Sequence, residues 1–155
     1  MDELAIARVL HILGVVLWIG GVSMVVTVLL PILAQSKSTS ESLRFFEAFR
    51  NRFAAQARYI TLLVGLSGFY MVYALNIWYR FLEWRFWWMH AMVFIWMVFS
   101  LMLFILEPRT RRRQLNAPQF SDPERIFNKI RRMHWILLSL SLITIAGAVL
   151  GSHGY

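Results

Sequence analysis

The chain has 155 residues, of which 59% are apolar and 15% charged, and its formal net charge is +8. It contains no cysteine, which excludes disulfides, thiolate catalysis and cysteine-ligated iron–sulfur clusters. The apolar residues gather in four blocks of about 20 residues, the length that crosses a bilayer, so there is no room for a separate soluble domain. The positive charge lies between these blocks, which favours lipid contact over nucleic-acid binding.

This pattern predicts an all-α fold, an integral membrane four-helix bundle that forms a single membrane domain over residues 1–155. The expected spans are residues 4–31, 59–79, 86–106 and 133–152. The first block is too long for a signal peptide, because it continues past Gly20 and Gly21 into further valines and leucines. No acidic residue lies within a span and no Ser or Thr sits in a nucleophile motif, so hydrolytic chemistry has little support.

Charge asymmetry predicts how the spans are oriented. Thirteen of the 16 lysines and arginines follow the first and third spans, close to the span ends. By the positive-inside rule these two connections are cytoplasmic, and both termini face outward. We therefore expect a protein of the bacterial inner (plasma) membrane whose basic loops contact anionic lipid.

The first span carries a histidine, His11, within a strongly apolar run. Residues three, four and seven apart share one face of a helix, so His11, Gly14, Trp18 and Gly21 should lie together. A polar ring at this depth is costly without a partner. His11 is therefore a candidate ligand, with Gly14 and Trp18 beside the bound group and Arg8 supplying a nearby charge.

The connection after the first span opens with Ser38-Thr39-Ser40-Glu41, which has capping-box spacing. Apolar residues at helical spacing follow over 43–53, from Leu43 to Phe53. They predict a short cytoplasmic amphipathic helix, either at the lipid surface or as a solvated linker, that leads into the second span. The aromatic-rich outer loop, residues 77–88, is explained by an interfacial belt or by a roof over a cofactor pocket.

The third span carries His90 near its outer end, with Trp87, Phe94 and Met97 expected on the same face. In the fourth helix, Ser121-Asp122-Pro123-Glu124 is a strong start signal. Gly147 and Gly151 form a GxxxG pair, which favours close helix packing.

His11 and His90 are expected at similar depth near the outer face, on different helices of the bundle. Two level histidines of this kind suit axial ligation of a b-type haem iron. The alternative is that each ring bonds a carbonyl or hydroxyl across a helix interface. His134, beside Arg131 and Arg132 at the inner face, and His153, at the chain end, are weaker metal-ligand candidates.

The same histidines could instead bind copper. Several methionines lie within or near the spans, among them Met89 and Met92 on either side of His90. Thioethers suit Cu(I), although methionine is also an ordinary filler of gaps between helices.

Two short motifs resemble known families. His11, Trp18 and Gly21 match a first-span pattern, and Trp88 and His90 match the start of a third span, of small four-helix bacterial proteins around the CopD (copper-resistance D) family and the HemJ-type protoporphyrinogen oxidases. The HemJ-type resemblance implies a histidine-held b-type haem and redox chemistry on a porphyrin, and the CopD resemblance implies copper handling.

The sequence therefore predicts a haem-b-binding inner-membrane protein for electron transfer or oxidation of a small substrate, such as a quinol or a porphyrinogen. Its catalytic residues stay unassigned. The alternatives are a copper-binding or copper-transport protein and a non-catalytic small subunit that docks through Gly147, Gly151 and the 43–53 helix. The expected partners are the lipid membrane, a quinone or other redox partner, and a second copy or a larger membrane complex, without nucleic acid.

Overall fold

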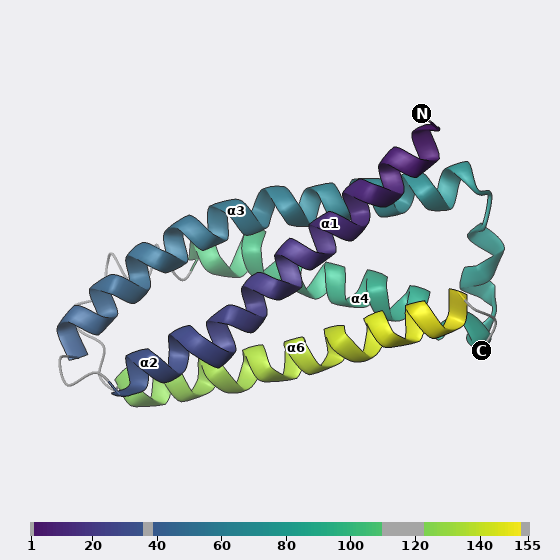
Figure 1. Cartoon of the computed structure of the whole chain (residues 1–155). Coiled ribbons are helices and arrows are strands. Elements are labelled where there is room, and N and C mark those ends of the chain that lie inside the picture. Colours follow the sequence, from purple (N-terminus) through teal and green to yellow (C-terminus); the bar gives the residue numbers. More distant parts are fainter. Residues whose placement is uncertain (1, 36–38, 110–122, 153–155) are drawn as a thin grey trace.

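The computed structural model describes residues 2–35, 39–109 and 123–152, and all the regular structure in these ranges is helical. In chain order the elements are α1 (Glu3–Met24), the π-helix η1 (Val25–Leu29), α2 (Leu30–Gln35), α3 (Thr39–Ala74), the 3₁₀ turns η2 (Trp78–Leu82) and η3 (Trp84–Phe86), α4 (Trp87–Leu101), the π-helix η4 (Met102–Leu106) and α6 (Pro123–Ser152). The predicted all-α four-helix bundle is confirmed (Figure 1).

Four helical stretches are long and apolar enough to cross a membrane. They are Glu3–Ile32, Ala48–Ala74, Trp84–Arg109 and Asn128–Gly151. Many large apolar side chains on these stretches point away from the bundle and are exposed. A soluble protein rarely exposes so much contiguous apolar surface, whereas lipid tails would cover it.

The helices are arranged so that α1 and α4 lie on opposite corners of the bundle. The longest packing interface joins α1 to α3, α4 packs on α6, and the α1–α6 and α3–α4 contacts close the ring (Figure 1). We call one end the η2 end, where α1 begins and α3 and α6 end. The opposite end, at which α2 lies and α3 and α6 begin, is the α2 end.

The core lies in the middle of the bundle and toward the α2 end. Trp18 of α1 is 5% exposed, and its ring meets Phe99 of α4 edge-on with the centroids 4.7 Å apart. Val22, Val26 and Leu138 belong to the same cluster. This cluster joins the two opposite corners of the bundle directly.

The residues predicted to form a separate amphipathic helix are instead the first part of α3. Two aromatic residues of this part, Phe49 and Phe53, pack against a buried cluster of Val25, Leu29 and Leu30. Gly21 makes room for this packing, since a Cβ there would lie 2.6 Å from the Phe53 ring. The proposed cap at Ser38 lies outside the described residues.

Local sequence determines where two of the helices end or begin. α3 ends at Ala74, earlier than the expected 79, because Asn76 takes a φ of 51°. Asparagine adopts this left-handed conformation more readily than most residues, and it interrupts the helix. α6 begins at Pro123, as its start signal predicted.

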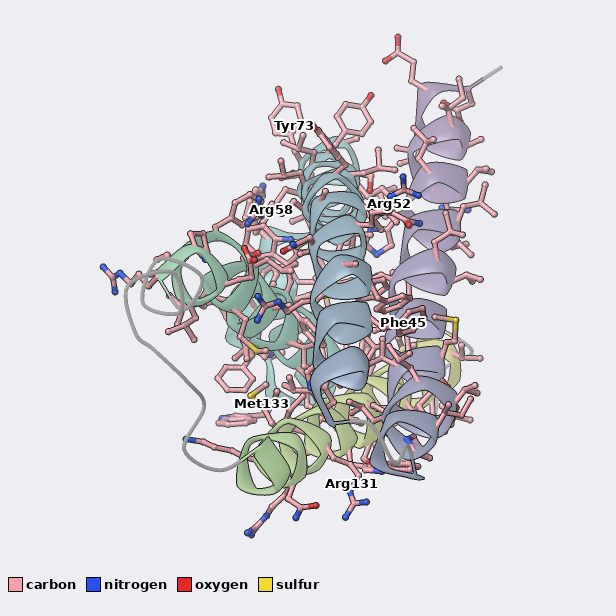
Figure 2. All side chains as sticks on the ribbon, turned by 90° about the vertical axis from the view of Figure 1, so that its left-hand side faces the viewer. Phe45, Arg52, Arg58, Tyr73, Arg131 and Met133 are labelled. Carbon is pink, nitrogen blue, oxygen red and sulfur yellow. The ribbon has the colours of Figure 1, made fainter. Side chains whose placement is uncertain are left out.

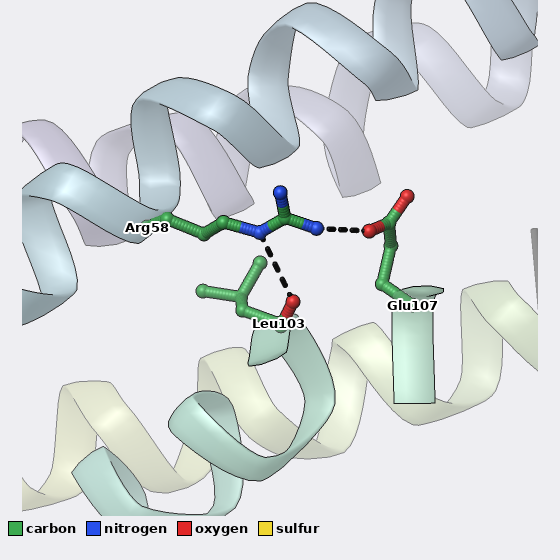
Figure 3. Close-up of polar contacts among 3 residues, drawn as sticks. All are labelled: Arg58, Leu103 and Glu107. Atoms are coloured by element: carbon green, nitrogen blue, oxygen red, sulfur yellow. Dashed lines mark hydrogen bonds and ion pairs between the residues drawn. The ribbon is translucent and has the colours of Figure 1, made fainter. Parts of the chain in front are cut away.

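A polar tie joins α3 to α4 near the α2 end. Arg58 donates from Nε to the carbonyl of Leu103 at 3.1 Å, and its guanidinium pairs with Glu107 (Figure 3). Leu103 lies in η4, and a π-helix bonds its backbone in the wider i→i+5 pattern that often marks such local interactions. Figure 2 views this end of the bundle along its axis, with Arg52 and Arg58 on α3 and Arg131 on α6.

Candidate functional site

A cavity of about 410 Å³ lies inside the bundle, between the core and the η2 end. All four long helices line it, together with Ile77 and the η2 residues Arg80 and Phe81. Its deepest lining includes Trp18 and Ile95, which also belong to the core cluster, so packed side chains close it toward the α2 end. Small-molecule sites in proteins are commonly of this size and largely apolar.

His11 lines this cavity and is held from one side by α3. Its Nδ1 lies 3.0 Å from the carbonyl of Val64 and 3.3 Å from the hydroxyl of Ser67, which itself donates to the Leu63 carbonyl. Gly68 lets the ring approach so closely, since a Cβ there would lie 3.1 Å from His11 Cε1. The missing side chain at Gly68 therefore allows His11 to pack directly against the backbone of α3.

The contact with Val64 also fixes the chemistry of the imidazole. A carbonyl oxygen can only accept, so Nδ1 carries the proton and donates it, which leaves a lone pair on Nε2. Nε2 has no hydrogen-bond partner among the described residues. A neutral imidazole with one oriented N–H and one open nitrogen is the form that ligates metals.

The other first-span candidates fall into two groups. Arg8 and Trp18 line the cavity with His11, whereas Gly14 is buried beside it and packs against Val64, 2.7 Å from where its Cβ would stand. The spacing argument for this face of α1 thus agrees with the packing.

His90 does not line the cavity. Its Nε2 donates to the carbonyl of Phe81 at 2.9 Å, and its ring stacks on Trp84 with the centroids 6.2 Å apart. Phe94 and Met97, expected on the same face, are 59% and 56% exposed, so this face of α4 points outward. The structure therefore does not bring His11 and His90 together around one cavity.

The side of α4 that does face the cavity carries sulfur rather than nitrogen ligands. Met89, Met92, Val93 and Trp96 line it at helical spacing, and Met71 of α3 joins them. Met89 and Met92 were named above as copper-ligand candidates, but the sequence did not show that their side of α4 faces inward, because spacing shows only which residues share a face.

His134, one of the two weaker histidine candidates, does not line the cavity. His134 donates from Nδ1 to the carbonyl of Ile130, one turn earlier in its own helix, at 2.9 Å. His153 lies outside the described residues. Within residues 2–35, 39–109 and 123–152, no three histidine, aspartate or glutamate side chains converge as a metal-binding group.

The glycine pair of α6 is already used inside the bundle. A Cβ at Gly147 would meet the Trp87 ring, and one at Gly151 would meet the Trp88 ring. These glycines therefore let α4 and α6 approach through two tryptophans, and this contact leaves no open GxxxG face for a docking partner.

Sequence reasoning missed Arg80, which was counted only as an outer charge. It lines the cavity from η2, together with Phe81, so the aromatic loop does form part of the cavity wall. The available signal was a cation within an aromatic-rich loop close to two glycine-bearing helices.

No protein-family model, curated protein or solved structure matches the chain. The resemblance to CopD and HemJ-type proteins therefore rests on the two short motifs alone.

Proposed function

We propose that the chain is a haem-b-binding protein of the bacterial inner membrane that works in electron transfer or in the oxidation of a small substrate. The observation that supports this most is the unpartnered Nε2 of His11, a residue that lines a largely apolar cavity. The basic α2 end would face the cytoplasm and the η2 end the outside.

The residues at the cavity fit a haem in three respects. His11 offers a nitrogen ligand whose tautomer the Val64 carbonyl fixes, a common arrangement behind haem and metal ligands. Trp18 and Trp96 supply aromatic walls for a flat apolar ring, and Arg8 and Arg80 supply positive charge for acidic groups on it.

The thioethers that line the cavity are the candidates for a second protein ligand that would hold the haem iron together with His11. Met71, Met89 and Met92 all line it, and iron held by one histidine and one methionine is a known arrangement that raises the reduction potential. His90 has a different part here, since it bonds the Phe81 carbonyl and so holds the loop that covers the cavity.

A bound haem would supply one-electron chemistry, and the chain's own residues would tune it. His11 holds the ring, the apolar lining excludes water, and the charges of Arg8 and Arg80 favour the more negative, reduced state. The loop of η2 separates the cavity from the outside, so a quinol or another donor would exchange electrons there.

The test is the optical spectrum of protein purified in detergent from haem-replete cells. We expect a Soret band and an α band that sharpens on reduction, and the loss of both in His11→Ala. The matched control is His134→Ala, which should keep the spectrum because its ring does not line the cavity. A colourless wild-type protein, or a His11→Ala variant with an unchanged spectrum, would contradict the proposal.

Copper is the second candidate, favoured by one observation. The three methionines and His11 that line the cavity form a soft donor set suited to Cu(I). Near-stoichiometric copper without haem in the purified protein would favour this function over the first.

A further inference from the structure

The cavity carries positive charge that no protein group neutralises. Arg8 and Arg80 line it, and no aspartate or glutamate does so among the described residues. The described ion pairs involve other arginines, Arg58 with Glu107 and Arg85 with Glu83. Arg80 is half-buried and Arg8 is exposed, and a cationic lining in a largely apolar cavity favours an anionic ligand.

Arg80 provides the second, independent observation. Its Nε is buried and has no hydrogen-bond partner among the described residues, while its guanidinium lies 4.9 Å from the centroid of the Phe86 ring. Buried N–H donors are nearly always satisfied in folded proteins, so an unused one beside a cavity indicates a missing acceptor. Phe86 holds the guanidinium in place without supplying that acceptor.

Arg85, in the same loop, is an arginine whose Nε has a partner within the protein. Its guanidinium also lies on the Phe86 ring, at 4.6 Å, but its Nε donates to Glu83 at 2.7 Å and its side chain is 72% exposed. It does not line the cavity. The two arginines therefore share a ring and differ in their partners.

Arg8 lies on the same face of α1 as His11, three residues earlier, which is a rise of about 4.5 Å toward the η2 end. Glu3, the acid nearest to it along α1, accepts a hydrogen bond from Tyr70 at 3.0 Å, and neither residue lines the cavity. The lining thus has an order along the bundle axis, with the imidazole deeper and the arginines nearer the η2 end.

From this order we infer that Arg80 and Arg8 bind the carboxylates of a porphyrin whose ring lies deeper in the cavity, against His11. This inference rests on the proposed function and specifies it: the ligand is a tetrapyrrole with free propionates that point toward the η2 end. Guanidinium groups match carboxylates in a two-pronged geometry and bind them more strongly than neutral partners do. Ring binding and iron ligation then become separable, because the arginines act on carboxylates and His11 acts on the metal.

The experiment uses metal-free protoporphyrin and its dimethyl ester, titrated into full-length protein produced in haem-limited cells. Binding is followed by quenching of tryptophan fluorescence, since Trp18, Trp88 and Trp96 line the cavity. We expect the diacid to bind at least about tenfold more tightly than the diester, as the loss of charge-assisted hydrogen bonds implies.

The variants separate the two contributions. Arg80→Gln should weaken diacid binding by about 10-fold to 100-fold and leave diester binding unchanged, and Arg80→Lys should restore part of the affinity. The matched control is Arg85→Gln, which should bind the diacid as wild type does. A thermal unfolding curve for each variant identifies any that fails to fold, and Arg80→Lys then takes the place of Arg80→Gln.

Equal affinity for diacid and diester would overturn the inference, as would equal weakening by Arg80→Gln and Arg85→Gln. Displacement of the diacid by an equal concentration of an anionic phospholipid would assign the site to lipid instead. The proposed haem function fails separately, when the haem spectrum does not depend on His11. If the protein prefers the diacid but shows no haem spectrum, the carboxylate-binding site is supported and the haem function is refuted.

Discussion

Gly65 of α3 gives the most direct test of how tightly this bundle is packed. It lies under the ring of Trp96 of α4, and a Cβ at this position would stand 2.6 Å from both Nε1 and Cε2 of that ring. Trp96 cannot move aside freely, because its Nε1 donates to the carbonyl of Thr61 at 2.9 Å and its ring meets Phe69 edge-on. Gly65→Ala must therefore displace an anchored side chain.

The expected cost of Gly65→Ala follows from three effects. Forcing a methyl group into a filled contact costs about 1–3 kcal/mol. Losing the hydrogen bond from Trp96 to Thr61 costs about 1 kcal/mol more. Alanine's better helix propensity returns up to about 1 kcal/mol. We therefore expect a net destabilisation of about 1–4 kcal/mol.

The assay is reversible unfolding in mixed micelles with increasing SDS, followed by circular dichroism, which yields a free energy of unfolding. The matched control is Gly20→Ala in α1, where a Cβ would meet nothing within 4 Å, so helix propensity alone should stabilise it by up to about 1 kcal/mol. If Gly65→Ala and Gly20→Ala unfold at the same SDS fraction, the close approach of α3 and α4 described above is incorrect.

Three further variants test other contacts by the same assay. Thr61 is fully buried and its hydroxyl has no partner among the described residues, so Thr61→Val should stabilise the fold by about 1 kcal/mol, and a loss instead would reveal a hidden partner. Arg58→Met leaves the Glu107 carboxylate, whose side chain is only 14% exposed, unpaired and should cost about 1–3 kcal/mol, and a double change with Glu107→Leu should cost less than the two single changes together. Trp18→Ala removes the ring that meets Phe99 and should cost about 3–5 kcal/mol, so a cost below 1 kcal/mol would contradict a well-packed centre.

Much of the fold was predictable because hydrophobic length alone specifies a span. The four helices, the start of α6 at Pro123 and the inward face of α1 all follow from simple sequence rules. One face of α1 differs from the others in carrying small residues and a polar ring. It contains Gly14, Gly21 and His11, which lies between apolar residues. The structure bears this out, since Gly14 and Trp18 are buried and His11 faces the cavity.

The part of the site on α4 was not predictable by the same rules. A helix that is apolar on every side has no polarity contrast to show which face points inward. His90 looked like the partner of His11 because the two have similar depth, but its rotation about the α4 axis was undetermined. Contacts with residues far along the chain determine this rotation. The Trp87 and Trp88 rings pack against Gly147 and Gly151 of α6, and this packing determines which residues of α4 face the cavity.

The edge-on contact of Trp18 with Phe99 closes the cavity toward the α2 end, because the core cluster packs around these two rings. A ligand that passed along the whole bundle would have to part the two opposite corners that this contact joins. A ligand that stayed near the η2 end would leave the same contact intact, so the cavity can be filled without disturbing the core of the bundle.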